Sequence, residues 1–244
     1  MITVKNSFPK PQSALVIVAH PDDAEFQCGA TLAKWAAGGT VVHHLVCTDG
    51  SKGTWNPHAD QVALIATRKA EQKAAAHKLS SQGSVTFLDQ VDGELQSDLA
   101  MRSEVARVIR QLRPQIIIGH DPWTRYRLHP DHRHAGLLAV EAIVAARDPF
   151  FFPEHDLEPH RPDALLLFEA EEPDHAEDVK GWESAKASAL LEHRSQFETT
   201  HRIRDANDPA EIKAFESRIR AELERLAEPF GLDSAEVFKA ITDL

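Results

Sequence analysis

The stretch Ala14-Leu15-Val16-Ile17-Val18-Ala19-His20-Pro21-Asp22-Asp23 decides the fold of this chain. It begins with a continuous apolar run, which is typical of a strand covered on both faces of a parallel sheet. A helical pattern follows over residues 25–37 and stops at Gly38-Gly39. The sequence therefore predicts a strand, a polar turn and a helix, which together form the repeating unit of an α/β fold.

The same alternation continues along the chain. Further apolar runs predict strands at residues 41–47, 85–88, 115–119 and 164–168. Helical patterns lie between them at residues 60–79, 98–112 and 131–147, and another helix is expected at about 178–196. This order predicts a three-layer α/β/α fold around a Rossmann-like, mostly parallel sheet.

The last part of the chain carries a helical signal of its own. Asp208 and Glu211 form a capping box, and Pro209 stands at the first helical position. Apolar residues then recur at helical spacing, namely Ile212, Phe215, Ile219 and Leu226. We therefore expect one main domain over residues 1–204. A helical C-terminal extension over residues 205–244 would pack on that domain or on a neighbouring subunit.

Composition disfavours several kinds of partner. The 27 Lys and Arg residues are outnumbered by 38 Asp and Glu residues, so the formal net charge is −11. Nucleic acids and anionic membranes attract clustered basic residues, and we expect neither as a partner. The two cysteines do not make a disulfide framework, and no secretory signal is expected at the N-terminus. The cytoplasm is the expected location, and self-association is compatible with the apolar stripe of the tail.

The first polar turn stands where parallel sheets place their chemistry, at the carboxyl end of a strand. A dinucleotide-binding protein would have a glycine-rich turn here, and this chain has none. Histidine and aspartate are ligands that zinc accepts, and the spacing of His20 and Asp23 allows both side chains to point to one side. Asp22 is then a candidate base beside the metal. The plainer alternative is that Asp22 or Asp23 only caps the following helix.

A second polar cluster follows the strand at residues 115–119. It runs through His120-Asp121-Pro122-Trp123 to His129-Pro130-Asp131-His132. Two clusters of this kind after two strands of one parallel sheet are hard to explain as helix caps alone. One histidine of the second cluster can complete a zinc site. Composition alone leaves His120, His129 and His134 open as the third ligand beside His132.

With both clusters in view, the chain resembles the LmbE-like, or PIG-L-type, N-acetylglucosamine de-N-acetylases. The resemblance rests on Ala19-His20-Pro21-Asp22-Asp23 with Glu25 and Gly29-Ala30-Thr31-Leu32-Ala33, and on His129-Pro130-Asp131-His132. Further matching features are Thr48-Asp49-Gly50-Ser51-Lys52-Gly53-Thr54, Arg68 with Glu71, Asp92-Gly93-Glu94-Leu95 and His193-Arg194-Ser195-Gln196. The resemblance covers roughly residues 14–197.

The resemblance implies a role for each of these residues. The metal ligands would be His20, Asp23 and His132, with Zn²⁺ as the expected ion and Fe²⁺ as an alternative. Asp22 would be the general base, His129 a protonated partner of the intermediate or leaving amine, and Asp131 the carboxylate that orients His129. The implied substrate-binding residues are Arg68 and Asp92. Some relatives have a tyrosine two residues before the first histidine of the second motif, where this chain has Arg127, with Tyr126 one position earlier.

The predicted function is that of a zinc-dependent hydrolase, a deacetylase that removes the N-acetyl group from an amino sugar or glycoconjugate. The expected partner is accordingly a small-molecule N-acetylated glycoside. One alternative is an amidase that cleaves a larger acyl group from a thiol–sugar conjugate or an antibiotic. Another is a non-catalytic, ligand-binding member of the fold. A nucleotide-binding oxidoreductase is disfavoured by the missing glycine motif.

Overall fold

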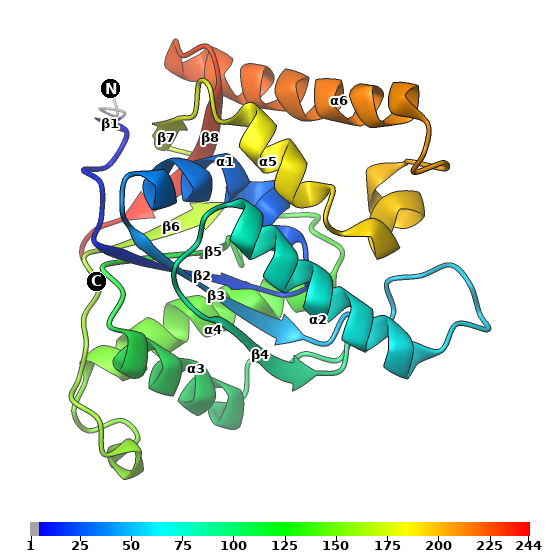
Figure 1. Ribbon diagram of the computed structural model, residues 1–244. Coiled ribbons are helices and arrows are strands. Elements are labelled where there is room, and N and C mark those ends of the chain that lie inside the picture. Colours follow the sequence, from blue (N-terminus) through cyan, green and yellow to red (C-terminus); the bar gives the residue numbers. More distant parts are fainter. Residues whose placement is uncertain (1–4) are drawn as a thin grey trace.

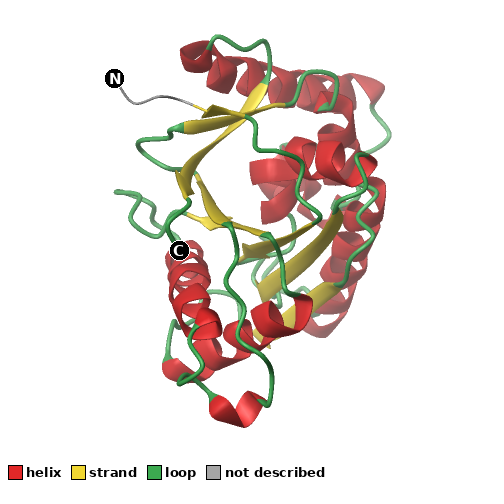
Figure 2. Ribbon diagram, turned by 90° about the vertical axis from the view of Figure 1, so that its left-hand side faces the viewer, coloured by secondary structure: helices red, strands yellow, loops and turns green. Residues whose placement is uncertain are grey.

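The computed structural model describes residues 5–244, which form one sheet with helices on both faces (Figures 1 and 2). The strands are β1 (Lys5–Asn6), β2 (Ser13–Val18), β3 (Val41–Thr48), β4 (Val85–Gln90), β5 (Ile116–His120), β6 (Ala164–Phe168), β7 (His175–Asp178) and β8 (Ala235–Ile241). The helices are α1 (Asp23–Ala37), α2 (Gln61–Lys78), α3 (Leu99–Leu112), α4 (Pro130–Arg147), α5 (Glu183–Leu190) and α6 (Pro209–Ala227). Short turns of other helix types are η1 (Pro153–His155), η2 (Arg194–Gln196), η3 (Phe197–His201) and η4 (Glu228–Phe230).

The strand order in the sheet is β1-β7-β8-β6-β5-β2-β3-β4. Strands β2 to β6 pair in parallel, whereas β8 is antiparallel to both β6 and β7. In the central pairs Val16 lies opposite His44 on one side and opposite Ile118 on the other. From β2 the chain moves outward to β3 in one direction and later to β5 in the other, so the direction of winding reverses between β2 and β5. The expected three-layer α/β/α fold is confirmed.

Alternation along β2 divides the core into two layers. Val16 and Val18 face the apolar side of α1, while Leu15 and Ile17 face α3 and α4. Successive side chains of a strand point to opposite faces, so a strand with helices on both sides must be apolar throughout. This is why residues 14–19 form a continuous apolar run. The buried strand β2 thereby fixes the position of the polar turn at residues 20–23, which follows its carboxyl end.

The C-terminal segment differs from its expectation. Residues 209–227 form α6, as the capping box predicted, with the Asp208 side chain accepting a hydrogen bond from the Ala210 N–H. The expectation of a wholly helical extension is wrong for residues 235–241, because β8 inserts between β6 and β7. The helix expected at 178–196 is also shorter, since α5 ends at Leu190. A domain boundary at residue 204 stays a prediction.

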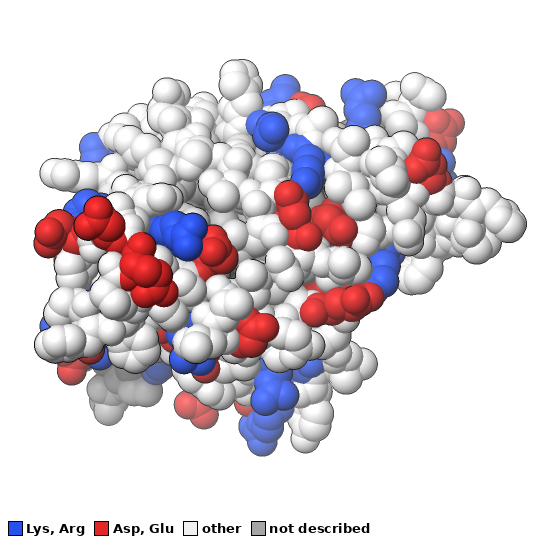
Figure 3. All heavy atoms as spheres, turned by 90° about the horizontal axis from the view of Figure 1, so that it is seen from below, with Lys and Arg blue, Asp and Glu red and all other residues white. Residues whose placement is uncertain are grey.

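Surface charge and helix hydrophobicity concern possible contacts with nucleic acids or membranes. On the face drawn in Figure 3, Lys and Arg side chains are dispersed among Asp and Glu side chains. No helix within residues 5–244 is long and apolar enough to cross a membrane.

Candidate active site and metal centre

The two polar clusters meet at the point where the winding of the sheet reverses. His20 follows β2, His120 ends β5, and the loop after β5 leads into α4, which begins at Pro130. Ligands of open α/β sheets bind beyond the carboxyl ends of strands at such a point. The topology therefore brings His20, Asp23 and His132 together, although 112 residues separate the two histidines.

Four donor atoms of these three residues lie at the spacing of a metal centre, since Asp23 contributes a different oxygen to each histidine. His20 Nδ1 lies 3.2 Å from His132 Nε2 and 3.4 Å from Asp23 Oδ2, and His132 Nε2 lies 3.4 Å from Asp23 Oδ1. Zinc bonds of about 2.0–2.2 Å imply distances of about 3.3–3.6 Å between the ligand atoms of a tetrahedron. The donor types and their separations thus fit a divalent metal ion.

The charges around His20 also favour a cation. Its Nε2 lies 3.1 Å from Asp131 Oδ2 and 3.3 Å from Asp92 Oδ1. Burial opposes protonation of His20, but hydrogen bonds to Asp131, Asp23 and Asp92 raise its pKa well above the ordinary value. Burial also opposes ionisation of Asp23, yet His132, His120 and His20 lower the pKa of that carboxyl. The site is therefore rich in buried carboxylates, and His20 forms one group within it, with His129 and His132, that could hold a metal ion.

His120, His129 and His134 are the other candidates for the third ligand, and the structure brings His120 and His129, but not His134, to the site. His120 Nε2 lies 3.4 Å from Asp23 Oδ2, and its ring stacks on His132 with 4.4 Å between centroids. It forms a possible metal group with Asp23 and His132, whereas His20 forms such groups with His129. His134 Nδ1 instead contacts Ser97. The spacing is therefore compatible with His120 as well as with the expected His20, Asp23 and His132 group.

Asp22 has an unusual backbone and no capping role. Its φ of 97° lies in the left-handed region, which a residue with a side chain adopts at a cost of about 1–3 kcal/mol. Its side chain makes no cap hydrogen bond to α1, and Asp23 Oδ2 accepts a hydrogen bond from the His20 N–H at 2.8 Å. The capping alternative is therefore wrong for Asp22. Strain of this kind is concentrated at functional sites, so it supports a chemical role for this residue.

Neighbouring side chains hold Asp22 in this conformation. Its N–H donates to Gln72 Oε1 at 2.9 Å, and Arg68 Nη2 donates to the Pro21 carbonyl at 2.7 Å. The same Arg68 nitrogen lies 3.4 Å from Asp22 Oδ2. Burial raises the pKa of Asp22 to about 6, although the Arg68 guanidinium opposes the rise. A carboxyl group with a raised pKa is a stronger base than an ordinary aspartate.

Gln72 was not identified from the sequence. Its Nε2 donates to Glu25 Oε1 at 2.8 Å while its Oε1 accepts from Asp22, so both ends of the amide are engaged. His193 Nε2 lies 3.3 Å from the other Glu25 oxygen, and all of these side chains are buried. Gln72 stands four residues after Arg68 and therefore on the same face of α2, which is the signal that could have revealed it.

Asp131 does not orient His129, which corrects our expectation. Its carboxylate accepts hydrogen bonds from the Gly93 and Leu95 N–H groups at 2.6 and 3.1 Å and contacts His20 Nε2. The loop after β4 and His20 occupy the space around this carboxylate. The Asp131 carboxylate therefore holds the ring of His20, not that of His129, and it does so on the side of the ring opposite His132.

His129 lies against the ring of His20 at the start of α4. Its ring centroid is 4.5 Å from that of His20, and its Nδ1 accepts a long hydrogen bond from the Asp131 N–H at the start of α4. Burial, with the nearby His20 and His132, lowers the pKa of His129 below 6.5. A protonated His129, which the resemblance implies, stays a prediction.

The two expected substrate-binding residues make contacts within the protein. Arg68 Nη1 donates to the Gly50 carbonyl at 3.0 Å, and Asp92 Oδ2 accepts from the Lys52 N–H at 3.1 Å. Asp92 also contacts His20, as described above. Both side chains line the hollow over the metal group. A direct contact with substrate stays a prediction for these residues.

Two hollows open at this site and share four residues. The catalytic hollow has a volume of about 320 Å³, and its lining includes His20, Arg68, Asp92 and His129. The C-terminal hollow has a volume of about 930 Å³, and its lining includes Phe26, Glu169, Leu226 and Phe230. The shared residues are Asp22, Asp23, His132 and Thr200.

Arg127 lies at the junction, whereas Tyr126 does not. Arg127 Nε is 2.9 Å from His132 Nδ1, and Arg127 Nη1 is 3.0 Å from Glu169 Oε1. Tyr126 is 90% exposed and belongs to the lining of neither hollow. Tyr126 therefore does not occupy the place of the tyrosine found in some relatives, and Arg127 does line the site.

Comparisons with known proteins place the chain in a family. Residues 15–143 match the family model PIG-L, described as GlcNAc-PI de-N-acetylase. The chain is 34% identical over 197 residues to diacetylchitobiose deacetylase of Thermococcus kodakarensis, covering 80% of this chain and 73% of that relative. It is 32% identical over 164 residues to 1D-myo-inositol 2-acetamido-2-deoxy-alpha-D-glucopyranoside deacetylase of Streptomyces avermitilis, covering 57% of this chain and 55% of that relative.

Solved structures agree with this assignment. N,N′-diacetylchitobiose deacetylase from Pyrococcus horikoshii superimposes with a TM-score of 0.86 at 26% identity, covering 98% of this chain and 87% of that chain. The long match includes α6 and β8, so the C-terminal segment belongs to the shared fold. The expected resemblance is thereby confirmed. The chain belongs to the PIG-L family of GlcNAc-PI de-N-acetylases.

Proposed function

We propose that this chain is a metal-dependent deacetylase that hydrolyses the N-acetyl group of an amino sugar or its glycoconjugate. The two relatives described above are named as deacetylases of such sugars. The observation that carries the proposal is the convergence of His20, Asp23 and His132 at 3.2–3.4 Å, next to the strained carboxylate of Asp22.

We propose His20, Asp23 and His132 as the metal ligands. Two imidazoles and one carboxylate suit Zn²⁺ in a catalytic site, and the same set suits Fe²⁺. Bound there, the ion supplies Lewis acidity, which polarises an amide carbonyl and acidifies water. Asp131 and Asp92 fix the ring of His20 through its Nε2, which leaves Nδ1 directed at the group.

Asp22 is the proposed general base. Its Oδ2 lies 3.4 Å from Arg68 Nη2, and the carboxylate would take the proton of the attacking water. The same proton can then pass to the departing nitrogen, because an amine leaves far more readily when it is protonated. His129, whose ring centroid is 4.5 Å from that of His20, is the proposed partner of the intermediate or of the leaving amine.

Three alternative functions can be weighed against this proposal. Membership of the deacetylase family argues against a nucleotide-binding oxidoreductase. The strain held at Asp22 argues against a non-catalytic descendant, since strain without function would be expected to relax. Release of a larger acyl group stays a prediction, and the identity of the released acid decides it. We also propose that the substrate is a small-molecule glycoside and that the protein is located in the cytoplasm.

Substitution of the base tests this function. The Asp22→Asn variant removes the proton acceptor and leaves the three proposed ligands in place. We expect an unchanged metal content and a fall in kcat of about 10²–10⁴-fold. The measurement is the release of acetate and free amine from N-acetylglucosamine and N,N′-diacetylchitobiose by zinc-loaded protein, with bound metal determined in parallel. Full activity in this variant would contradict the assignment.

A further inference from the structure

Helix α1 is interrupted just after the turn that carries the chemistry. It runs from Asp23 to Ala37, but Cys28 has φ −143° and ψ 19°, which are not helical values. The break divides α1 into a first turn at residues 23–27 and a longer part that follows it. Asp23 stands at the start of the first turn, and Asp22 immediately precedes it. The direction of this turn therefore affects both the proposed ligand and the proposed base.

A carboxylate from the C-terminal strand lies at the break. Glu236 of β8 accepts hydrogen bonds from the Ala30 N–H at 3.1 Å and from the Thr31 N–H at 2.7 Å, with a different oxygen for each. In an uninterrupted α-helix these N–H groups would donate to the carbonyls of residues 26 and 27. A carboxylate that accepts from the first N–H groups of a helical segment caps it, and the helix dipole favours its negative charge. Glu236 thus caps the longer part of α1 from a position that is distant in the chain.

A buried ammonium group lies on the other side of the break. Lys186 of α5 donates through Nζ to the Phe26 carbonyl at 2.6 Å and to Glu236 Oε1 at 2.6 Å. Lys186 is 4% exposed and Glu236 is 1% exposed, so solvent does not compete for these contacts. The Phe26 carbonyl is the one that the Ala30 N–H would reach in a regular helix. The ion pair therefore supplies partners to both sides of the broken backbone.

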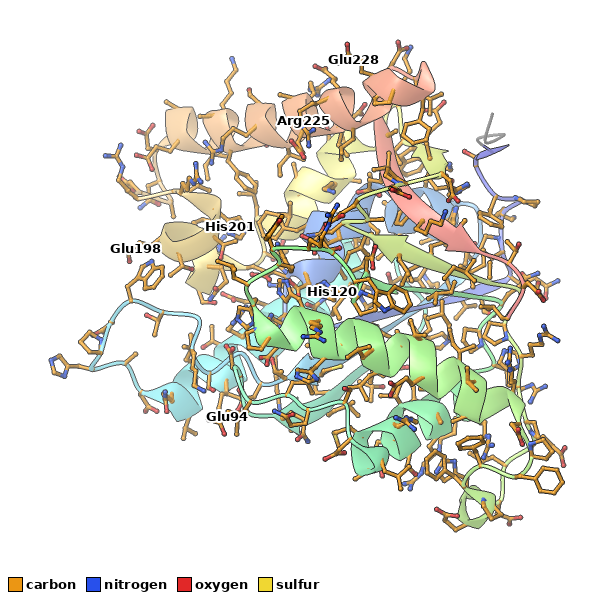
Figure 4. All side chains as sticks on the ribbon, turned by 180° about the vertical axis from the view of Figure 1, so that it is seen from behind. Glu94, His120, Glu198, His201, Arg225 and Glu228 are labelled. Carbon is orange, nitrogen blue, oxygen red and sulfur yellow. The ribbon has the colours of Figure 1, made fainter. Side chains whose placement is uncertain are left out.

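The two residues of the pair come from elements that pack against α1. In Figures 1 and 4, α5 (yellow) and β8 (red) lie beside α1 (blue), and Glu228 at the end of α6 marks where the chain turns back toward β8. Gly29 gives Lys186 room to reach the break, because a Cβ atom at residue 29 would lie 3.3 Å from Lys186 Cγ. Neither Lys186 nor Glu236 lines either hollow of the site. Any effect of the pair on the chemistry therefore passes through α1.

The first turn of α1 is held at both of its ends. At its start the Asp22 N–H donates to Gln72 Oε1 at 2.9 Å. At its end the Phe26 carbonyl accepts from Lys186, as described above. Between these two contacts, Asp23 places its oxygens 3.4 Å from the nitrogens of the proposed histidine ligands. A misplacement of about 1 Å in a catalytic site can cost about 10²-fold in rate, so the contact at the end of the turn matters for the carboxylates at its start.

We propose that Lys186 and Glu236 are positioning residues for the reaction. Their ion pair fills the break in α1 and thereby fixes the carboxylates of Asp22 and Asp23 at the site. Lys186 sets the end of the first turn, and Glu236 sets the start of the longer part of the helix. The inference rests on the proposed deacetylase function. It adds to that function a role for α5 and β8, which supply none of the proposed metal ligands.

Removal of both charges separates positioning from stability. In Lys186→Met/Glu236→Leu the two parts of α1 can join into one regular helix, because the N–H groups of residues 30 and 31 can return to carbonyls of the helix itself. Replacing a buried ion pair by apolar residues is often neutral for stability. We therefore expect a urea midpoint of unfolding close to that of the wild type. The zinc dissociation constant should nevertheless rise, and kcat on N,N′-diacetylchitobiose should fall with little change in KM, each effect being about 10–100-fold.

Two further variants of the full-length protein complete the test. Lys180→Met/Asp233→Leu is the matched control, because it removes an exposed ion pair between the segments that lead into α5 and β8. We expect it to leave zinc affinity and kcat unchanged. Glu236→Gln retains the size of the side chain but only one acceptor oxygen, so its amide NH₂ would face the Ala30 or Thr31 N–H. We expect it to weaken zinc binding and to lower kcat by about 10-fold.

The outcomes distinguish this inference from the proposed function. A folded double variant at Lys186 and Glu236 with zinc affinity and kcat within twofold of the wild type would overturn the inference, because the pair would then only stabilise the fold. If the double variant does not fold, the same two measurements on Glu236→Gln decide in the same way. Wild-type protein that binds zinc but releases no acetate would overturn the proposed function, and the zinc affinities of the variants would still decide the inference.

Discussion

Replacing Asp131 by asparagine should weaken metal binding, although Asp131 is not among the proposed ligands. The two carboxylate oxygens accept from different N–H groups, of Gly93 and Leu95, and one of them also contacts His20 Nε2. An asparagine has only one oxygen, so its amide NH₂ would face at least one of these donors. The ring of His20 would then lose its charged partner.

The size of the effect follows from these contacts. Loss of a carboxylate that orients a metal-binding histidine typically weakens metal affinity by about 10–100-fold. At 25 °C this factor corresponds to about 1.4–2.7 kcal/mol of binding free energy. The free energy of unfolding should also fall by about 1–3 kcal/mol, because a buried donor is left without an acceptor.

A zinc titration of metal-free protein against a competing chelator measures the first effect. Asp156→Asn is the matched control, because Asp156 is exposed and has a positive φ that asparagine tolerates. A zinc affinity of Asp131→Asn within twofold of the wild type would refute the reasoning. If kcat fell at the same time, the originally expected role, in which Asp131 acts through His129, would be the better explanation.

Three further changes probe other parts of the structure. Gln72→Leu should lower kcat by about 10-fold or more through loss of the Asp22 conformation, and should have no further effect on kcat in an Asp22→Asn background. Lys186→Met should lower the free energy of unfolding by about 3–5 kcal/mol in urea denaturation, because it leaves Glu236 charged, buried and unpaired. Glu177→Gln should make the free energy of unfolding fall less steeply below pH 4.5. Burial raises the pKa of Glu177, but hydrogen bonds to His175 and Lys34 lower it overall. The ionised Glu177 therefore stabilises the fold above pH 4.5, and this contribution is lost as the pH falls through the folded-state pKa.

Each of these predictions has a contradicting outcome. A further fall in kcat when Gln72→Leu is added to Asp22→Asn would mean that Gln72 acts on the fold and not through the Asp22 carboxylate. A loss of under about 1 kcal/mol in Lys186→Met would mean that the Glu236 carboxylate is stabilised by its two hydrogen bonds from Ala30 and Thr31 alone. Thermal unfolding measured from pH 6 to pH 3 decides the third case, where parallel curves for Glu177→Gln and the wild type would remove Glu177 as a cause.

The five central strands, the first four helices and α6, and the place of the chemistry could be predicted from the sequence, whereas β1, β7 and β8 could not. A strand buried on both faces must be apolar throughout, so residues 14–19 could be predicted to form a buried strand before its partner strands were known. Polar clusters after two such strands must meet at one edge of a parallel sheet. This argument predicts that His20 and Asp23 lie near the second cluster. The choice of His132 within that cluster needed the family resemblance.

The contacts between side chains of the site depend on the folded chain and could not be predicted from local sequence. Asp131 holds His20 rather than His129 because the Gly93–Leu95 loop packs beside it, and the contact joins segments 111 residues apart. Strand β8 forms because it pairs with the edges of β6 and β7, although its own sequence only weakly indicates a strand. Periodicity reports the face on which a residue lies. The partner on that face, and the volume of the space between two elements, depend on contacts that are distant in the chain.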